Sequence, residues 1–289
     1  MFLAMPKLPT ELDLQIIEEY RDDPSTLSIL TLVCKSWLHA SRFHLLRKVH
    51  VTAMTLAMTA FFCSLTHYLP RESFGPYIQE LYLSSLMYQC FDSYAEKPFF
   101  ASPPFEIHAL ASVLHMLPRL QILVVSNLRL VGKVFQLPSN RPSLTFLAIQ
   151  SALYIEDSVD DLLAFISLFS SVDTLSLNLS SDFPSIGMRY YTSGEEFLDA
   201  LFKQTKIRSL TARAMPPLWA LPSYGSTRLQ DLSRSALEAI NLWPRADLVN
   251  IAYIGALVQS AAKLLSPVRT VRINLMHRDG ETYSKYSTL

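Results

Sequence analysis

Glycine, cysteine and net charge are all scarce in this sequence of 289 residues. The seven glycines are scattered, so none forms the GxGxxG or GxxxxGK loop with which dinucleotide-binding and P-loop enzymes hold phosphate. The three cysteines, Cys34, Cys63 and Cys90, form neither a CxxC metal-ligand pair nor a disulfide framework, which favours a reducing location, cytoplasmic or nuclear. Because 25 basic residues balance 25 acidic ones, the positive charge typical of nucleic-acid-binding proteins is missing, and we expect no nucleic-acid partner.

Motifs for catalysis are also missing. The seven histidines include no HxxxH or HExxH pair, and there is no GxSxG nucleophile elbow. Two acidic pairs, Asp160-Asp161 and Glu195-Glu196, each open a predicted helix, where the helix dipole favours negative charge. We therefore expect no enzyme, no cofactor and no bound metal. A hydrolytic triad assembled from distant residues would leave no such motif and stays an alternative.

We expect no membrane segment. The first dozen residues lack the long apolar stretch of a secretory signal. Residues 51–69 carry no formal charge and are nearly as long as the roughly 20 residues that cross a bilayer. Four threonines nevertheless fall on one side of this stretch when it is drawn as a helix: Thr52, Thr55, Thr59 and Thr66. A polar stripe is typical of a helix packed in a soluble protein, which we expect here and at residues 248–265.

The first fifty residues have the pattern of a small helical module. One helix begins after Pro9 and ends at Asp22-Asp23-Pro24-Ser25. A second apolar run then follows at helical spacings: Leu27, Leu30, Val33, Cys34 and Trp37. Because Cys34 lies within this apolar run, we expect a buried, neutral thiol. So short a module has a marginal core, so we expect it to pack against the rest of the chain or to bury an apolar face on a partner.

From residue 78 onward a short pattern recurs, LxxLxL, whose first, fourth and sixth positions are apolar. Six copies are clear: Ile78-Leu81-Leu83, Leu120-Leu123-Val125, Leu144-Leu147-Ile149, Val172-Leu175-Leu177, Ile207-Leu210-Ala212 and Val268-Val271-Ile273. A weaker copy, Leu229-Leu232, has Arg234 at its last apolar position. Residues 107–117, 159–169 and 195–202 have helical spacing between the copies. The sequence therefore predicts an α/β fold, an irregular leucine-rich-repeat-like solenoid of parallel strands alternating with helices, behind a small N-terminal helical module.

In such a solenoid the first, fourth and sixth residues face a shared core, and the residues between them face the other side of the sheet. We expect this outward set to be Glu80, Tyr82, Ile122, Val124, Phe146, Ala148, Thr174, Ser176, Thr211, Arg213, Thr270 and Arg272. Its middle is apolar and its end is basic, and net charge likewise changes from −5 over residues 51–188 to +5 over residues 189–289. Such a charge asymmetry is expected of a face that binds a partner in one orientation. It is expected equally of a solvated face that has no special role.

Three strings in the N-terminal module belong together: Leu8-Pro9-x-Glu11-Leu12, Leu32-Val33-Cys34-Lys35-x-Trp37 and Phe43-His44-Leu45. With them the module resembles an F-box, over about residues 5–50. The whole chain is similar to F-box proteins of fungal type that carry degenerate leucine-rich repeats behind the box. The resemblance implies an F-box module at residues 5–50, a leucine-rich-repeat-like solenoid at 51–276 and a polar tail at 277–289.

In that family the box binds the Skp adaptor of a cullin–RING ubiquitin ligase, and the repeats hold the protein to be ubiquitinated. The resemblance therefore implies a substrate-recognition subunit that performs no chemistry itself. It assigns adaptor docking, or the small core that supports docking, to Leu8, Pro9, Leu12, Ile16, Val33, Cys34 and Trp37. For the unknown protein substrate we expect anchors on the outward face, namely Tyr82, Val124 and Phe146, with Arg213 and Arg272 for orientation.

A second interpretation also agrees with these residues. The chain would be a protein-binding repeat scaffold outside any ubiquitin ligase, and the F-box would be a structural cap on the open end of the solenoid. The seven residues of the module would then only pack its three helices against the first repeat.

Overall fold

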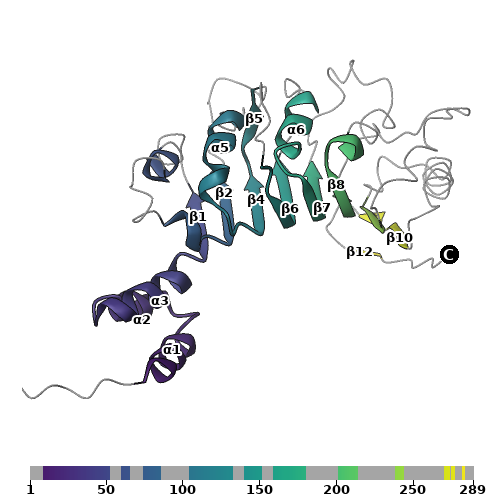
Figure 1. Cartoon of the computed structure of the whole chain (residues 1–289). Coiled ribbons are helices and arrows are strands. Elements are labelled where there is room, and N and C mark those ends of the chain that lie inside the picture. The colour runs from purple at the N-terminus through teal and green to yellow at the C-terminus, as the bar shows by residue number, and fades with distance from the viewer. Residues whose placement is uncertain are drawn as a thin grey trace, which may run out of the picture.

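The computed structural model describes residues 9–52, 60–65, 74–85, 104–132, 140–151, 159–179, 201–213, 238–243, 270–273, 275–276 and 282–283. Within these residues the chain is an α/β protein in which three N-terminal helices precede an eight-stranded parallel sheet (Figure 1). No helix in this part of the chain is long and apolar enough to cross a membrane.

Three helices form the N-terminal module: α1 (Thr10–Glu19), α2 (Pro24–Leu30) and α3 (Lys35–Leu45). Helix α1 begins after Pro9, as the sequence predicts. At the start of α2 the Asp23 carboxylate accepts hydrogen bonds from the backbone N–H groups of Ser25 and Thr26, which would otherwise lack a partner. The break between α1 and α2 is therefore set by an aspartate cap followed by proline at the first helical position.

The apolar run from Leu27 to Trp37 is not one continuous helical face, and that prediction is wrong. Helix α2 ends at Leu30, where the Thr31 hydroxyl donates a 2.6 Å hydrogen bond to the carbonyl of Ser28. Such a side-chain bond satisfies a carbonyl at the end of a helix and competes with further helical turns. A short turn then leads to the extended backbone at the start of α3.

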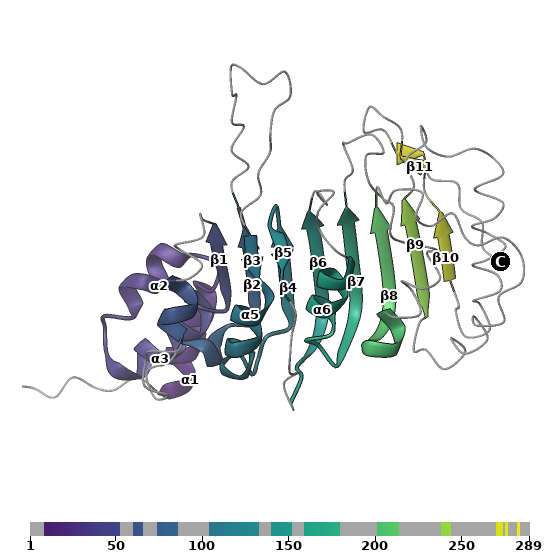
Figure 2. The ribbon, with the colours of Figure 1, turned by 90° about the horizontal axis from the view of Figure 1, so that it is seen from above.

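Eight strands form the main sheet: β1 (Lys48–Thr52), β2 (Glu80–Ser84), β4 (Ile122–Ser126), β6 (Ser143–Ser151), β7 (Ser171–Leu179), β8 (Lys206–Arg213), β9 (Ala239–Trp243) and β10 (Thr270–Ile273). They lie side by side in that order, and every neighbouring pair is parallel (Figure 2). Because the order in space follows the order in sequence, each strand is added to the same edge of a growing sheet, as in a solenoid.

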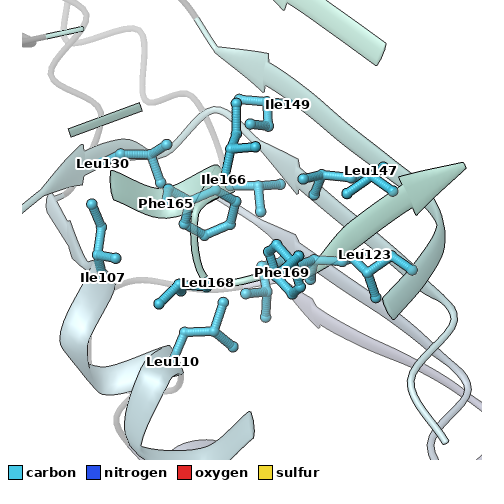
Figure 3. Close-up of a cluster of buried hydrophobic side chains, with 14 of the residues drawn as sticks. Ile107, Leu110, Leu123, Leu130, Leu147, Ile149, Phe165, Ile166, Leu168 and Phe169 are labelled. Carbon is cyan, nitrogen blue, oxygen red and sulfur yellow. The ribbon is translucent and has the colours of Figure 1, made fainter. Parts of the chain in front are cut away.

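The first five predicted copies of LxxLxL are confirmed, since all of their apolar positions are buried. They face a layer that covers one side of the sheet (Figure 1). Its elements are α5 (Ile107–Val113), the 3-10 turn η2 (Leu114–Met116), α6 (Val159–Ile166) and the short parallel pair β3 (Pro104–Glu106) and β5 (Arg129–Val131). Phe165 of α6 lies at the centre of this core, with Ile107 and Leu110 of α5 and Leu123 and Leu147 of the sheet around it (Figure 3).

Two strands were missed in the sequence, although both carry the same pattern. The pattern of β1 begins two residues before the strand, in Leu46-Arg47-Lys48-Val49-His50-Val51, and that of β9 begins in Leu237-Glu238-Ala239-Ile240-Asn241-Leu242. The strand register supports both patterns. Val51 pairs with Leu83 and Ile240 pairs with Leu210, and both leucines are predicted core positions. Trp243, which is followed by Pro244, ends strand β9.

The side of the sheet opposite α5 and α6 is called the open face, and strand register arranges it in three rows. The first row is Lys48, Glu80, Ile122, Phe146, Thr174, Ser209, Ala239 and Thr270. The second row is His50, Tyr82, Val124, Ala148, Ser176, Thr211, Asn241 and Arg272. The third row is Thr52, Ser84, Ser126, Gln150, Asn178, Arg213 and Trp243. The predicted outward residues all occupy these rows, with Thr211 and Arg213 one row later than expected.

The remaining predictions have mixed outcomes. The helices predicted at residues 107–117 and 159–169 are confirmed, and Asp160-Asp161 lies in the first turn of α6. Of residues 51–69, the first two end β1 and residues 60–65 are helical. Strand β12 (Thr282–Tyr283), within the predicted polar tail, pairs with β11 (Leu275–Met276) in an antiparallel hairpin. The 3-10 turn η1 (Gly75–Tyr77) precedes β2. The weak copy at Leu229, residues 195–200 and residues 248–265 lie outside the described residues.

Candidate functional site

The helical module separates its core residues from its exposed ones. Ile17 and Leu27 are its buried apolar side chains, each only 1% exposed, and helix α3 packs against both α1 and α2. The residues predicted for adaptor docking lie elsewhere: Pro9, Leu12, Val33 and Cys34 are exposed, Ile16 and Trp37 are half-buried, and Leu8 lies outside the described residues. Sequence alone left docking and core support undivided, whereas the burial pattern places four of the seven on the surface.

All of the exposed large apolar residues in the described part of the chain lie in this module: Leu12, Leu14, Tyr20, Ile29, Leu32 and Val33. Three of them lie at the end of α2 and in the turn before α3. We call these residues, Ile29, Leu32 and Val33, the apolar turn. Leu32 is 84% exposed, Ile29 65% and Val33 58%. Covering such a side chain completely is worth about 1.5–3 kcal/mol. Three exposed apolar side chains within five residues make this part of the module a candidate interaction surface.

Cys34 departs from the expectation of a buried, neutral thiol. It is exposed, because it occupies the extended position that caps α3 rather than the interior of a helix. Its Sγ lies 3.0 Å from the Ser36 hydroxyl. This side-chain hydrogen bond and, after it, one from the backbone N–H of Trp37 lower the pKa of the Cys34 thiol.

The module joins the sheet through the chain and a few peripheral contacts. Only Leu46 and Arg47 separate the end of α3 from the start of β1. The His39 Nδ1 atom lies 3.3 Å from the Tyr77 hydroxyl, and the Arg119 guanidinium lies 5.9 Å from the centre of the Phe43 ring. The hydrophobic core cluster of the solenoid contains no residue of α1, α2 or α3. Module and solenoid therefore have separate cores.

A shallow groove of about 460 Å³ lies between α1 and α3, lined by Leu14, Gln15, Glu18, Ala40, Phe43 and His44. Across it, His44 Nε2 lies 3.3 Å from Glu18 Oε2, so the two helices also share a polar contact. Because Phe43 lines the groove and also carries the Arg119 contact, the groove lies next to the junction with the solenoid.

On the open face, the first two strands hold a cluster of aromatic and charged side chains. The rings of His50 and Tyr82 are stacked, with centroids 4.3 Å apart and planes 9° apart, and Lys48 Nζ lies 4.8 Å from the Tyr82 ring centre. The Tyr82 hydroxyl donates a 3.2 Å hydrogen bond to Glu80 Oε2. Burial and, after it, the negative charge of Glu80 raise the pKa of the Tyr82 phenol. Neighbouring side chains thus hold both the ring and the hydroxyl of Tyr82 in place.

The five residues predicted to bind substrate fall into two groups along the sheet. Tyr82 and Val124 are direct partners in register on β2 and β4, and Phe146 lies one row away on β6. Arg213 on β8 pairs in register with Asn178 on β7, and Arg272 is exposed on β10. Six strand spacings separate β2 from β10, which is about 29 Å. The three predicted apolar and aromatic anchors therefore lie on consecutive strands, whereas the two arginines occupy the far part of the same face.

Three features of the open face were missed in the sequence. Lys48 and His50 were overlooked because β1 was not predicted, although its six-residue pattern would have revealed it. The third row is polar from β1 to β7, with hydrogen-bond contacts between Thr52 and Ser84 at 3.1 Å and between Ser126 and Gln150 at 3.2 Å. On β9 the Asn241 amide donates to the Thr211 hydroxyl at 3.4 Å. No three potential metal ligands gather anywhere among the residues with described positions.

Together the repeats and the register define a class of protein: an α/β repeat protein with N-terminal helices and a parallel sheet. Comparison with protein-family models and with curated proteins finds no match. Among solved structures, the chain is similar to a leucine-rich repeat-containing protein from Legionella pneumophila, at 14% identity and a TM-score of 0.30, with 88% of this chain and 82% of that chain covered. The class assigned here comes from the strand register and the buried LxxLxL positions of the chain itself.

Proposed function

We propose that this chain is a substrate-recognition subunit of a Skp–cullin–F-box ubiquitin ligase. The helical module docks a Skp-type adaptor, and the open face of the sheet binds a target protein. The observation that carries the proposal is the apolar turn of Ile29, Leu32 and Val33, which is largely exposed in a module whose own core is Ile17 and Leu27. The resemblance of residues 5–50 to an F-box supplies the identity of the partner.

The proposed role requires no chemistry from this chain. A target held on the open face is brought close to the ubiquitin-carrying subunits by the adaptor, so the contribution to the reaction is proximity. Tyr82, Val124 and Phe146 act as target anchors, because aromatic and apolar side chains at the centre of an interface contribute most of the affinity. Such an assembly places the chain in the cytoplasm or the nucleus.

One observation speaks against the alternative in which the module is only a structural cap. A cap on a solenoid would bury apolar residues of the first repeat under its own apolar side chains. Here the core cluster of the solenoid includes Val51, Phe62 and Leu65 near its first strand but no residue of the helical module. The most exposed apolar residues of the module belong to the apolar turn rather than to a capping face.

The test is binding of the purified full-length chain to a purified Skp adaptor by calorimetry. Leu32→Asp places a charge in the apolar turn, and we expect it to weaken adaptor binding at least thirtyfold while the folded chain retains its circular dichroism. Because Leu32 is 84% exposed, the substitution leaves the core of the module intact. The matched control is Val124→Asp on the open face, which should change adaptor affinity less than twofold.

Two outcomes would contradict the proposal. If the intact chain does not bind the adaptor, the ligase role is wrong and the scaffold interpretation gains support. If it binds, but Leu32→Asp and Val124→Asp bind equally well, docking uses a surface other than the apolar turn.

A further inference from the structure

The charge on the open face differs from that of the chain as a whole. The chain has no net charge, with 25 basic and 25 acidic residues. The three rows of the open face hold three basic residues, Lys48, Arg213 and Arg272, but one acidic residue, Glu80. These charges lie at the two ends of the described sheet, and the strands between them carry none in the three rows. A negatively charged partner is complementary to this arrangement.

The single carboxylate pairs with the cation beside it, but the cation is the more exposed of the two. Glu80 Oε2 accepts the hydrogen bond of the Tyr82 hydroxyl, and its side chain is 20% exposed. Lys48 Nζ lies 4.0 Å from the same oxygen, but the Lys48 side chain is 52% exposed. The Glu80 carboxylate is therefore the more enclosed partner of the pair, while the side chain of Lys48 and the residue His50 remain exposed. A partner that approaches this end of the open face meets a hydrogen-bond donor with positive charge.

Next to this cluster the open face is apolar. Ile122, Val124 and Phe146 are half-buried residues on β4 and β6, and Ala148 beside them is only 2% exposed. The half-buried side chains leave apolar surface for a partner to cover, and no charged side chain of the three rows interrupts it. The charged end and the apolar patch are neighbours, so one ligand can contact both.

We propose that the open face takes an extended polypeptide segment that has an acidic residue close to an apolar anchor and further acidic residues toward its other end. Lys48 and His50 receive the first acidic side chain, Val124 and Phe146 receive the apolar one, and Arg213 and Arg272 receive the others. This inference rests on the proposed function, because it specifies the kind of target that the substrate-recognition subunit binds.

Strand spacing sets the length of the segment. From β1 to β4 is two strand spacings, about 10 Å, which an extended chain covers in about three residues. From β1 to β10 is seven spacings, about 34 Å, or about ten residues. The recognised segment therefore has an acidic residue about three positions from an apolar or aromatic residue, and acidic residues again about seven and ten positions from the first. Because the apolar patch lies nearer one end, the spacing also fixes the direction of binding.

The experiment is selection of random twelve-residue peptides displayed on phage against the immobilised full-length chain. We expect Asp and Glu to be enriched at least threefold over the starting library, at positions flanking an apolar residue. The best peptide is then synthesised, and its affinity is measured by fluorescence anisotropy beside a copy in which Asn and Gln replace Asp and Glu. The amide copy should bind at least tenfold more weakly, with a difference that shrinks as salt is raised.

Two variants of the chain locate the acidic subsite. Lys48→Glu should weaken binding of the acidic peptide at least tenfold. Lys206→Glu is the matched control, because Lys206 is exposed at the start of β8, five strand spacings from β1, and should change the affinity less than twofold. An equal effect of the two substitutions would overturn the assignment of Lys48, since general charge repulsion would then explain both.

The outcomes separate this inference from the proposed function. If the chain binds the adaptor but selects only neutral apolar peptides, or none, the acidic specificity is wrong and the ligase role stands. If it selects acidic peptides that Lys48→Glu no longer binds but does not bind the adaptor, the open-face ligand stands and the ligase role is wrong. If the selected peptides are acidic but bind Phe146→Asp as tightly as the intact chain, the apolar subsite is wrong.

Discussion

His50 and Tyr82 stack ring on ring across the first two strands of the sheet, with centroids 4.3 Å apart. The contact follows from strand register, which places His50 opposite Tyr82 and Lys48 opposite Glu80. Lys48 also lies over the Tyr82 ring, so two side chains of β1 hold one side chain of β2. Strand β1 is therefore more than the connection between the helical module and the repeats, because it fixes the Tyr82 ring, the proposed aromatic anchor of the open face.

Removing the Tyr82 ring should weaken target binding. Tyr82→Ala deletes the stack with His50 and the contact with Lys48, and we expect at least a tenfold loss of affinity for a peptide selected on the intact chain. Tyr82→Phe keeps the ring and removes only the hydrogen bond to Glu80, so its affinity should stay within threefold. Fluorescence anisotropy with circular dichroism as a folding check measures both. Equal losses would mean that the hydroxyl, and not the ring, is the contact.

Arg141 should stabilise the solenoid by joining two repeats. Its Nη1 atom donates to the carbonyl of Ser167 at 2.9 Å, just after α6, and to the carbonyl of Gln204 at 3.0 Å, in the helical turn before β8. Positive charge at the carboxyl end of a helix is favourable, and hydrogen bonds from a charged donor are the stronger kind. Arg141→Ala should lower the free energy of unfolding by about 1–3 kcal/mol, measured by urea denaturation.

Arg208→Ala is the control for this prediction. Arg208 Nε lies 2.9 Å from Glu238 Oε2, but both side chains are exposed, and exposed ion pairs contribute little to stability. Urea midpoints that shift equally for the two alanine variants would show that Arg141 contributes no more than a surface ion pair.

The two faces of the sheet should respond differently to loss of an aromatic ring. Phe165 is fully buried between Phe105 and Phe169, with ring centroids 6.4 Å and 6.1 Å away. Phe165→Ala should cost about 3–5 kcal/mol of unfolding free energy, because it leaves a cavity in the core. Phe146→Ala on the open face should cost clearly less and instead weaken peptide binding. Thermal melts of both variants check this, and a lower melting temperature for Phe146→Ala than for Phe165→Ala would reverse the assignment of the faces.

The core of the repeats could be predicted from the sequence because one short pattern, LxxLxL, determines it. Leu81 and Leu83 in β2, and Leu175 and Leu177 in β7, are buried for the same reason, namely the alternation of side chains along a strand. Strand β1 was missed because its pattern begins at Leu46, directly after helix α3, and so overlaps residues 5–50, which were assigned to the helical module. Strand β9 escaped because the weaker copy at Leu229 lies eight residues ahead of its own pattern at Leu237.

The candidate sites were harder to predict, since they depend on which side chains are left uncovered. Val33 and Cys34 have the helical spacing of core residues, yet the early end of α2 at Leu30 leaves both exposed. No sequence pattern distinguishes an apolar residue that packs in the core of its own chain from one that only a binding partner covers. The stack of His50 on Tyr82 depends on the register of strands 32 residues apart, and register follows from packing of the whole sheet.

The cap of helix α2 gives a prediction that links pH to the proposed adaptor surface. The side-chain hydrogen bonds from Ser25 and, after it, Thr26 lower the pKa of Asp23 to about 2. A carboxylate with a lowered pKa stabilises the folded state above its ordinary value of 3.8, and this contribution is lost as the pH falls through about 2. Ser25→Ala removes the 2.5 Å bond from the Ser25 hydroxyl and should move the Asp23 titration midpoint upward, toward 3.8. Carbon-detected NMR of the Asp23 carboxyl measures the midpoint.

Ser28→Ala is the matched control, because Ser28 is an exposed serine of the same helix whose substitution leaves the Asp23 contacts in place. Its Asp23 midpoint should stay at about 2. Since α2 leads directly into the apolar turn at Ile29, Leu32 and Val33, Asp23→Ala should also weaken adaptor binding without touching that surface. An Asp23 carboxyl that titrates near 3.8 in the intact chain would mean that the cap is not formed in solution, and adaptor affinity should then be insensitive to Asp23→Ala.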